Sequence, residues 1–180
     1  MVYKWLKPVT NPSNTKLMTH ITFFGSRYFF FPVYVLVVAF YLFFKKDVRL
    51  AFDIAIVGIV GNQIWSLLQN DIFHRTRPID PLIPNVTGYG FPSGHSFSSY
   101  TFCGLITYLI WQTKLQTIWK VIFSVVLFLI ATIIAISRVY LHVHYATDVI
   151  GGFCLSVMWL ILSLWLLSKI SIKFIQRKNH

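Results

Sequence analysis

The sequence predicts an all-α fold: a polytopic bundle of transmembrane helices in a single membrane-embedded domain spanning residues 1–180. Hydrophobic residues make up 56% of the chain and charged residues only 12%, whereas roughly a quarter of a soluble protein is charged. The apolar residues form long runs separated by short basic clusters. None of these runs alternates strictly between polar and apolar residues, as the strands of a membrane β-barrel do, so helices are expected.

Five apolar runs are expected to cross the membrane: Tyr28–Phe44, Leu50–Leu68, Ser96–Trp111, Val121–Ile136 and Val149–Ser168. A spanning helix needs about 20 apolar residues, so the shorter runs must be extended by their polar flanks. The segment before the first run, Met1–Arg27, carries Lys4, Trp5 and Lys7, which suit a membrane–water boundary. We expect an interfacial helix there.

The longest polar stretch, residues 70–95, separates the second and third runs and is expected to be a loop. Prolines and glycines interrupt it at Pro78, Pro81, Pro84, Gly88, Gly90, Pro92 and Gly94, and such punctuation is typical of irregular structure.

The net charge of +11 would suit either nucleic acid or an anionic membrane surface. The basic residues lie between apolar runs, which favours the membrane and gives no indication of nucleic-acid binding. With five spans, one side of the membrane collects nine basic residues: Lys45, Lys46, Arg49, Lys114, Lys120, Lys169, Lys173, Arg177 and Lys178. The other side collects seven, and three of these, Arg75, Arg77 and Arg138, are candidates for the functional site described below. With those three set aside, the positive-inside rule places the side with nine basic residues and the C-terminus in the cytoplasm. The polar loop then faces outward, as on the periplasmic or extracellular face of a bacterial plasma membrane.

Three polar segments fall on that outer side: HRTRP at the end of the second run, FPSGHS at the start of the third, and SRVYLHVHYATD before the fifth. In the second segment, Ser93 is predicted to be the N-cap of a helix, and Gly94 lets the backbone come close to a ligand. The free N–H groups at such a helix start attract anions. Arg77 and Arg138 supply guanidinium forks, which bond two phosphate oxygens at once. Arg75 is a further candidate cation.

His144 and Asp148 are four residues apart, which places them on one face of a helix. A carboxylate that accepts one ring N–H leaves the other ring nitrogen to attack phosphorus. His95 would give a proton to the departing oxygen and later activate water. His142 is expected to be structural. Arginines around the site disfavour a metal cation, so no metal or other cofactor is expected.

These motifs resemble those of the type-2 phosphatidic acid phosphatases (PAP2), also called the lipid phosphate phosphatase superfamily. Pro92-Ser93-Gly94-His95 matches one signature completely, as Ser137-Arg138, His144 and Asp148 match another. In the remaining signature Arg77-Pro78 is present, but Asn70 stands where the family has a lysine. The resemblance implies a metal-independent phosphatase with His144 as nucleophile, Asp148 as its partner and His95 as acid. Arg77, Arg138, Ser93 and Gly94 would hold the phosphate, and Arg75 or Asn70 would serve where the lysine is missing.

The expected substrate is a membrane lipid phosphate whose tail stays in the bilayer, such as an isoprenyl pyrophosphate (for example undecaprenyl pyrophosphate), phosphatidylglycerophosphate or phosphatidate. A lipid A phosphatase, a lipid phosphotransferase and a non-catalytic anion-binding scaffold are the alternatives. The scaffold is disfavoured because binding alone needs no paired histidine and carboxylate. The oligomeric state is left open.

Overall fold

The computed structural model describes residues 7–178, with side chains placed for residues 8–170, and Lys4 and Trp5 lie outside this range. Its elements are η1 (Lys7–Val9), α2 (Pro12–Phe23), α3 (Arg27–Phe43), α4 (Val48–Leu67), a π-helical turn η2 (Leu68–Ile72), α5 (Gly94–Trp111), α6 (Thr117–Tyr140) and α7 (Ala146–Lys178). No strand occurs between residues 7 and 178. The predicted all-α membrane bundle is confirmed.

The five predicted spans correspond to α3–α7, and the helix expected before them is α2. Four segments of the described chain are long and apolar enough to cross a membrane: Pro12–Phe43, Val48–Ile72, Thr117–Tyr140 and Ala146–Ile170. The remaining predicted span, α5, has 18 residues, which gives a helix about 27 Å long.

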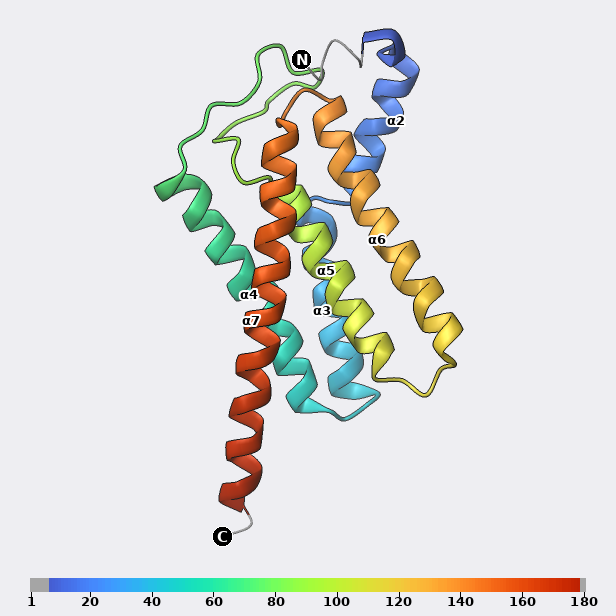
Figure 1. Ribbon diagram of the computed structural model, residues 1–180, viewed down its shortest axis with the longest axis vertical. Helices are drawn as coiled ribbons and strands as arrows, with labels where there is room; N and C mark the ends of the chain where they lie inside the picture. The colour runs from blue at the N-terminus through green and yellow to red at the C-terminus, as the bar shows by residue number, and fades with distance from the viewer. Residues whose placement is uncertain (1–6, 179–180) are drawn as a thin grey trace.

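Helix α5 carries more polar residues than the other spans because it lies at the centre of the bundle (Figure 1), where it contacts α3, α4, α6 and α7. Ser96, Ser99 and Thr101 are buried within it, and Thr101 Oγ1 donates to Ser156 Oγ of α7 over 3.1 Å. A neighbouring helix thus satisfies a polar group that lipid could not, although Ser99 Oγ has no hydrogen-bond partner among the described residues. The low apolarity of α5 therefore reflects its position.

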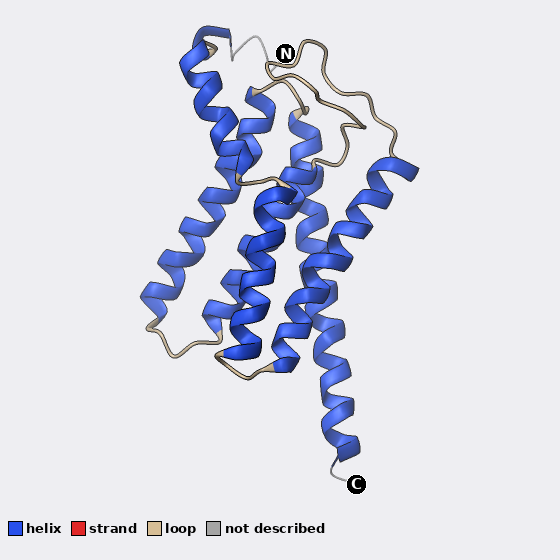
Figure 2. Cartoon of the chain, turned by 180° about the vertical axis from the view of Figure 1, so that it is seen from behind, coloured by secondary structure: helices blue, strands red, loops and turns tan. Residues whose placement is uncertain are grey.

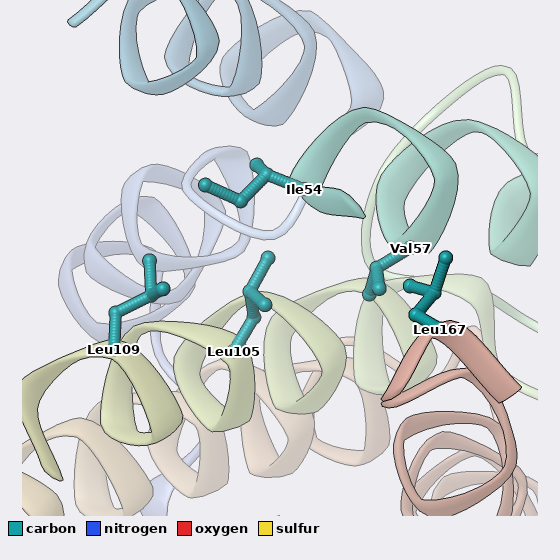
Figure 3. Packing of buried hydrophobic residues seen from close by; sticks show 5 residues of the cluster. All are labelled: Ile54, Val57, Leu105, Leu109 and Leu167. Atoms are coloured by element: carbon teal, nitrogen blue, oxygen red, sulfur yellow. The ribbon is translucent and has the colours of Figure 1, made fainter. Parts of the chain in front are cut away.

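The apolar core joins α4, α5 and α7. Its buried residues are Ile54, Val57, Leu105, Leu109 and Leu167 (Figure 3). Close helix approach adds to this packing, since Gly61 lies against the ring of Trp159, whose Nε1 donates to Val57 O over 2.8 Å. Small residues that allow such approach are typical of membrane helix interfaces.

The two ends of the bundle differ in character. The loop between η2 and α5 lies at one end, together with the end of α6 and the start of α7 (Figures 1 and 2). The short α3–α4 and α5–α6 connections lie at the other end, and α7 continues beyond them. Helix α2 packs on the loop end of α6.

Candidate active site

The loop between η2 and α5 is held in place by part-buried polar contacts with α4 and η2. Trp65 Nε1 donates to Pro92 O over 3.0 Å. Gln69, which is buried at the start of η2, donates from Nε2 to Tyr89 O over 2.9 Å. These bonds fix the loop just before α5, so they position the PSGH segment.

Helix α5 begins as the sequence predicts, with Ser93 as its N-cap. The Ser93 side chain accepts from Ser96 N at 3.5 Å and from Ser96 Oγ at 3.1 Å. Ser93 N donates to Asp148 O over 3.0 Å, which ties the start of α5 to α7. A side chain at Gly94 would collide with the indole of Trp65, so only glycine fits this close approach.

His144 lies at the centre of the site and is 2% exposed. Its Nδ1 lies 2.7 Å from Gly90 O, and its Nε2 lies 3.1 Å from Arg77 Nη1. A carbonyl only accepts and a guanidinium only donates. The neutral ring that satisfies both neighbours carries its proton on Nδ1 and its lone pair on Nε2, a tautomer assigned from these partners.

Asp148 is fully buried, and its Oδ2 lies 3.6 Å from His144 Nδ1. Contrary to the prediction of a shared helix, His144 precedes α7, which begins at Ala146. The two residues still meet, because Asp148 Oδ2 accepts from Tyr145 N over 2.8 Å and folds the first turn back. The carbonyl of Gly90 lies closer to Nδ1 than the carboxylate does.

Arg77 is fixed by backbone oxygens on two sides of the site. Its Nε donates to Gly88 O and its Nη1 to Val143 O, both over 3.0 Å, in addition to the Nη1 contact with His144. A guanidinium held in this way keeps one orientation beside Nε2.

Arg138, near the end of α6, is 6% exposed. Its Nη1 donates to Thr22 Oγ1 of α2 over 2.8 Å, and its Nε has no hydrogen-bond partner among the described residues. His95 is half-buried and interacts electrostatically with Arg138, His144 and Arg77. Arg77, Arg138 and both predicted catalytic histidines are therefore brought together.

The two candidates for the missing lysine, Arg75 and Asn70, differ in their partners. Arg75 Nη1 donates to Asp148 Oδ1 and to Thr147 Oγ1, each over 2.7 Å, and its guanidinium lies 4.6 Å above the ring of Tyr145. Asn70 is exposed and donates back to Ser66 Oγ one turn earlier over 3.2 Å. The structure thus places Arg75 on the carboxylate, and it gives Asn70 no described contact with the site.

Three groups that position the site were not predicted from the sequence: the Gln69 side chain, the Gly90 carbonyl and the Thr22 hydroxyl. A buried glutamine beside a proline-rich loop is a weak signal for the first. For the other two the sequence gives no signal, because a backbone carbonyl has no side chain and Thr22 lies 116 residues from its partner.

Burial lowers the pKa of His144 to about 4, against the raising effect of Asp148. Burial also lowers the pKa of Arg77, and the charge of Asp148 opposes this shift. The desolvated imidazole is therefore neutral at neutral pH, the state in which a ring nitrogen acts as a nucleophile.

Among the described residues, no group of three His, Cys, Asp or Glu side chains is placed to hold a metal ion.

A groove of about 820 Å³ runs between α3, α4 and α5. Its walls are mostly apolar, with residues such as Phe31, Val38, Ala39 and Ala55. Polar residues also line it, and they are Arg27, Asn62, Gln63, Ser98 and Thr101.

Comparison with known proteins gives consistent matches. The chain is 28% identical over 151 residues to phosphatidylglycerophosphatase B of Bacillus subtilis, with 83% of this chain and 73% of that protein covered. It is 30% identical over 140 residues to an undecaprenyl-diphosphatase of Sulfolobus acidocaldarius, with 77% of this chain and 64% of that protein covered.

Among solved structures, the transmembrane PAP2-type phosphatidylglycerolphosphate phosphatase of Bacillus subtilis matches with a TM-score of 0.81 and 29% identity. The match covers 93% of this chain and 83% of that one. The sequence profile of the PAP2 superfamily matches residues 28–172. With the fold, the spaced motifs and this match in agreement, the chain belongs to the PAP2 superfamily.

Proposed function

We propose that this protein is an integral-membrane lipid phosphatase that hydrolyses a phosphomonoester or diphosphate through a phosphohistidine on His144. The observation that carries the proposal is the setting of His144. The unprotonated Nε2 faces Arg77, while Gly90 O accepts the proton on Nδ1. A nucleophilic nitrogen and a phosphate-binding fork thus meet at one point.

In the first step, the lone pair of His144 Nε2 attacks phosphorus and forms an N–P bond. The P–O bond to the lipid breaks, and His95 gives its proton to the departing oxygen. Arg77 and Arg138 neutralise the phosphoryl oxygens, and the backbone N–H groups at the start of α5 add a further anion site. The carboxylate of Asp148, 3.6 Å from Nδ1, stabilises the positive charge that develops on the ring.

In the second step, His95 takes a proton from water as the water oxygen attacks phosphorus. The N–P bond breaks, its electron pair returns to Nε2, and inorganic phosphate leaves. The two steps use only groups of the protein, the substrate and one water molecule.

The groove between α3, α4 and α5 supports a substrate with a long apolar tail. Its volume of about 820 Å³ and its apolar walls suit an acyl or isoprenyl chain. The named relatives act on a glycerophospholipid phosphate and on an isoprenyl diphosphate, so we propose these two classes as substrates.

We further propose that the site faces outward and that the C-terminus is cytoplasmic. The loop end of the bundle carries the site, whereas the α3–α4 and α5–α6 connections lie at the opposite end (Figure 1). These connections contain Lys45, Lys46 and Lys114, and the first turn of α6 contains Lys120. In a cysteine-free background, Ile79→Cys should react with an impermeant maleimide in intact cells, and Lys114→Cys only after permeabilisation. The reverse pattern would invert the assigned orientation.

The deciding experiment uses protein purified in detergent with chelator present and measures phosphate release from lipid phosphates of both classes. Release should disappear in His144→Ala. In the wild type, rapid quenching with ³²P-labelled substrate should trap an acid-labile phosphoenzyme that His144→Ala cannot form. Phosphate release without such an adduct would point to direct attack by water, and transfer of the label to an alcohol would point to a phosphotransferase.

A further inference from the structure

Helix α2 contacts the site through Thr22, which is the buried residue of that helix. Its Oγ1 accepts from Arg138 Nη1 over 2.8 Å, and both residues are 6% exposed. A charge-assisted hydrogen bond that is shielded from solvent is among the stronger polar contacts in a protein.

Further contacts fix the end of α2 where Thr22 lies. Met18 packs against the buried cluster of Tyr140, Leu141 and Val143, which follows Arg138. In the turn after α2, a methyl group at Gly25 would collide with Ile134 and lie 3.1 Å from His95 Cδ2. The end of α2 and its turn therefore lie against α6 beside Arg138 and against α5 beside His95.

The hydrogen bonds of Arg138 show what Thr22 contributes. A guanidinium carries five N–H donors, and Thr22 fixes the direction of Nη1. The buried Nε has no acceptor among the described residues. A phosphate oxygen would supply the acceptor, because the planar fork presents Nε and a terminal nitrogen along one edge.

We propose that Thr22 is a positioning residue, whose hydroxyl holds the Arg138 guanidinium in the orientation that binds the phosphoryl group. This inference rests on the proposed function in that Arg138 is taken as a phosphate ligand. It extends the functional unit beyond residues 28–172, the part matched by the family profile, to include α2.

The test removes the acceptor while keeping the side-chain shape. In Thr22→Val, the affinity for orthovanadate should fall about tenfold, as should kcat/KM for a lipid phosphate, because a buried guanidinium donor loses its partner. Affinity is measured from the vanadate-induced rise in melting temperature, which needs no turnover, and from the inhibition constant. Thr22→Ser restores the hydroxyl and should restore both values.

Thr19→Val is the matched control. Thr19 lies on the same helix, is exposed, and donates only to Thr15 O over 2.8 Å; its loss should leave vanadate affinity and turnover unchanged. A double-mutant cycle with Arg138→Lys isolates the contact. In that background, Thr22→Val should change vanadate affinity less than about twofold.

Two results would overturn the inference alone: wild-type vanadate affinity in Thr22→Val while Arg138→Ala weakens it, or Thr22→Ser as defective as Thr22→Val. If Arg138→Ala binds vanadate like the wild type, the phosphate role of Arg138 fails together with this inference. Should Thr22→Val not fold, Thr22→Ala takes its place in the comparison with Thr22→Ser.

Discussion

Arg75 Nη1 lies 2.7 Å from Asp148 Oδ1, whereas the nearest described contact of Asp148 with His144 is 3.6 Å long. The side chain of Arg75 is 39% exposed and that of Asp148 is fully buried. Arg75 thus provides the counter-charge for the buried carboxylate, on the side away from the imidazole. Its partner is the carboxylate that we propose stabilises charge on the His144 ring, so its effect on a bound phosphate would be indirect.

We expect Arg75→Ala to lower kcat about tenfold while the inhibition constant for vanadate changes less than about threefold. Asp148 would lose its closest ion pair, so the carboxylate would no longer be held in a fixed position beside the imidazole. Steady-state kinetics and vanadate inhibition on detergent-purified protein separate the two effects.

A matched control for Arg75 is Arg49→Ala, which breaks a 3.9 Å pair with Asp53 on α4. Its kcat should equal that of the wild type. A loss of vanadate affinity in Arg75→Ala as large as in Arg77→Ala would instead make Arg75 a direct phosphate ligand.

The pH dependence of kcat/KM tests the environment of His144. Its pKa is lowered to about 4 by burial, so the nucleophilic neutral ring persists well below pH 6.5 and is lost only as the pH falls through about 4. Because Asp148 raises this pKa, Asp148→Asn should move the acid limb to still lower pH, while lowering kcat. The ionisation of the substrate is common to both enzymes, and only the shift between them reports on His144. A wild-type acid limb near pH 6.5 with no shift in Asp148→Asn would contradict the assigned environment.

Periodicity and motif spacing predicted much of this molecule. The apolar runs located α3–α7, and Ser93 was correctly predicted as the cap of α5. The three motifs predicted to bind phosphate lie at one end of the bundle, as their order along the chain predicted.

What the sequence could not predict depends on tertiary contacts. The helical spacing of His144 and Asp148 predicted a direct pair, but the chain bends before α7, and Gly90 O becomes the nearer partner of Nδ1. Likewise, the signature position of Asn70 suggested a site residue, whereas the π-helical turn η2 buries the preceding residue, Gln69.

The neighbouring residues Gln69 and Asn70 provide a paired test of that difference. We expect Gln69→Leu to destabilise the protein by about 1–3 kcal/mol, since the carbonyl of Tyr89 loses its donor in a part-buried bond and that of Pro92 loses a longer, buried 3.4 Å contact. Asn70→Ala should change neither melting temperature nor kcat/KM by a measurable amount. A large activity loss in Asn70→Ala would place Asn70 in the site, contrary to its observed bond with Ser66.

If the groove between α3, α4 and α5 binds the apolar tail of the substrate, narrowing it should affect long-chain substrates more than short-chain ones. Ala55→Phe adds a ring to its wall, so KM for a long-chain lipid phosphate should rise about tenfold, the loss of a few buried methylenes at about 0.8 kcal/mol each. A short-chain phosphate that does not fill the groove should be hydrolysed as by the wild type. Val126→Phe enlarges a 46% exposed side chain on α6 outside the groove and should affect neither substrate. Equal losses on long and short chains in Ala55→Phe would show that the substitution disturbs the catalytic site, and the tail would then have to bind elsewhere.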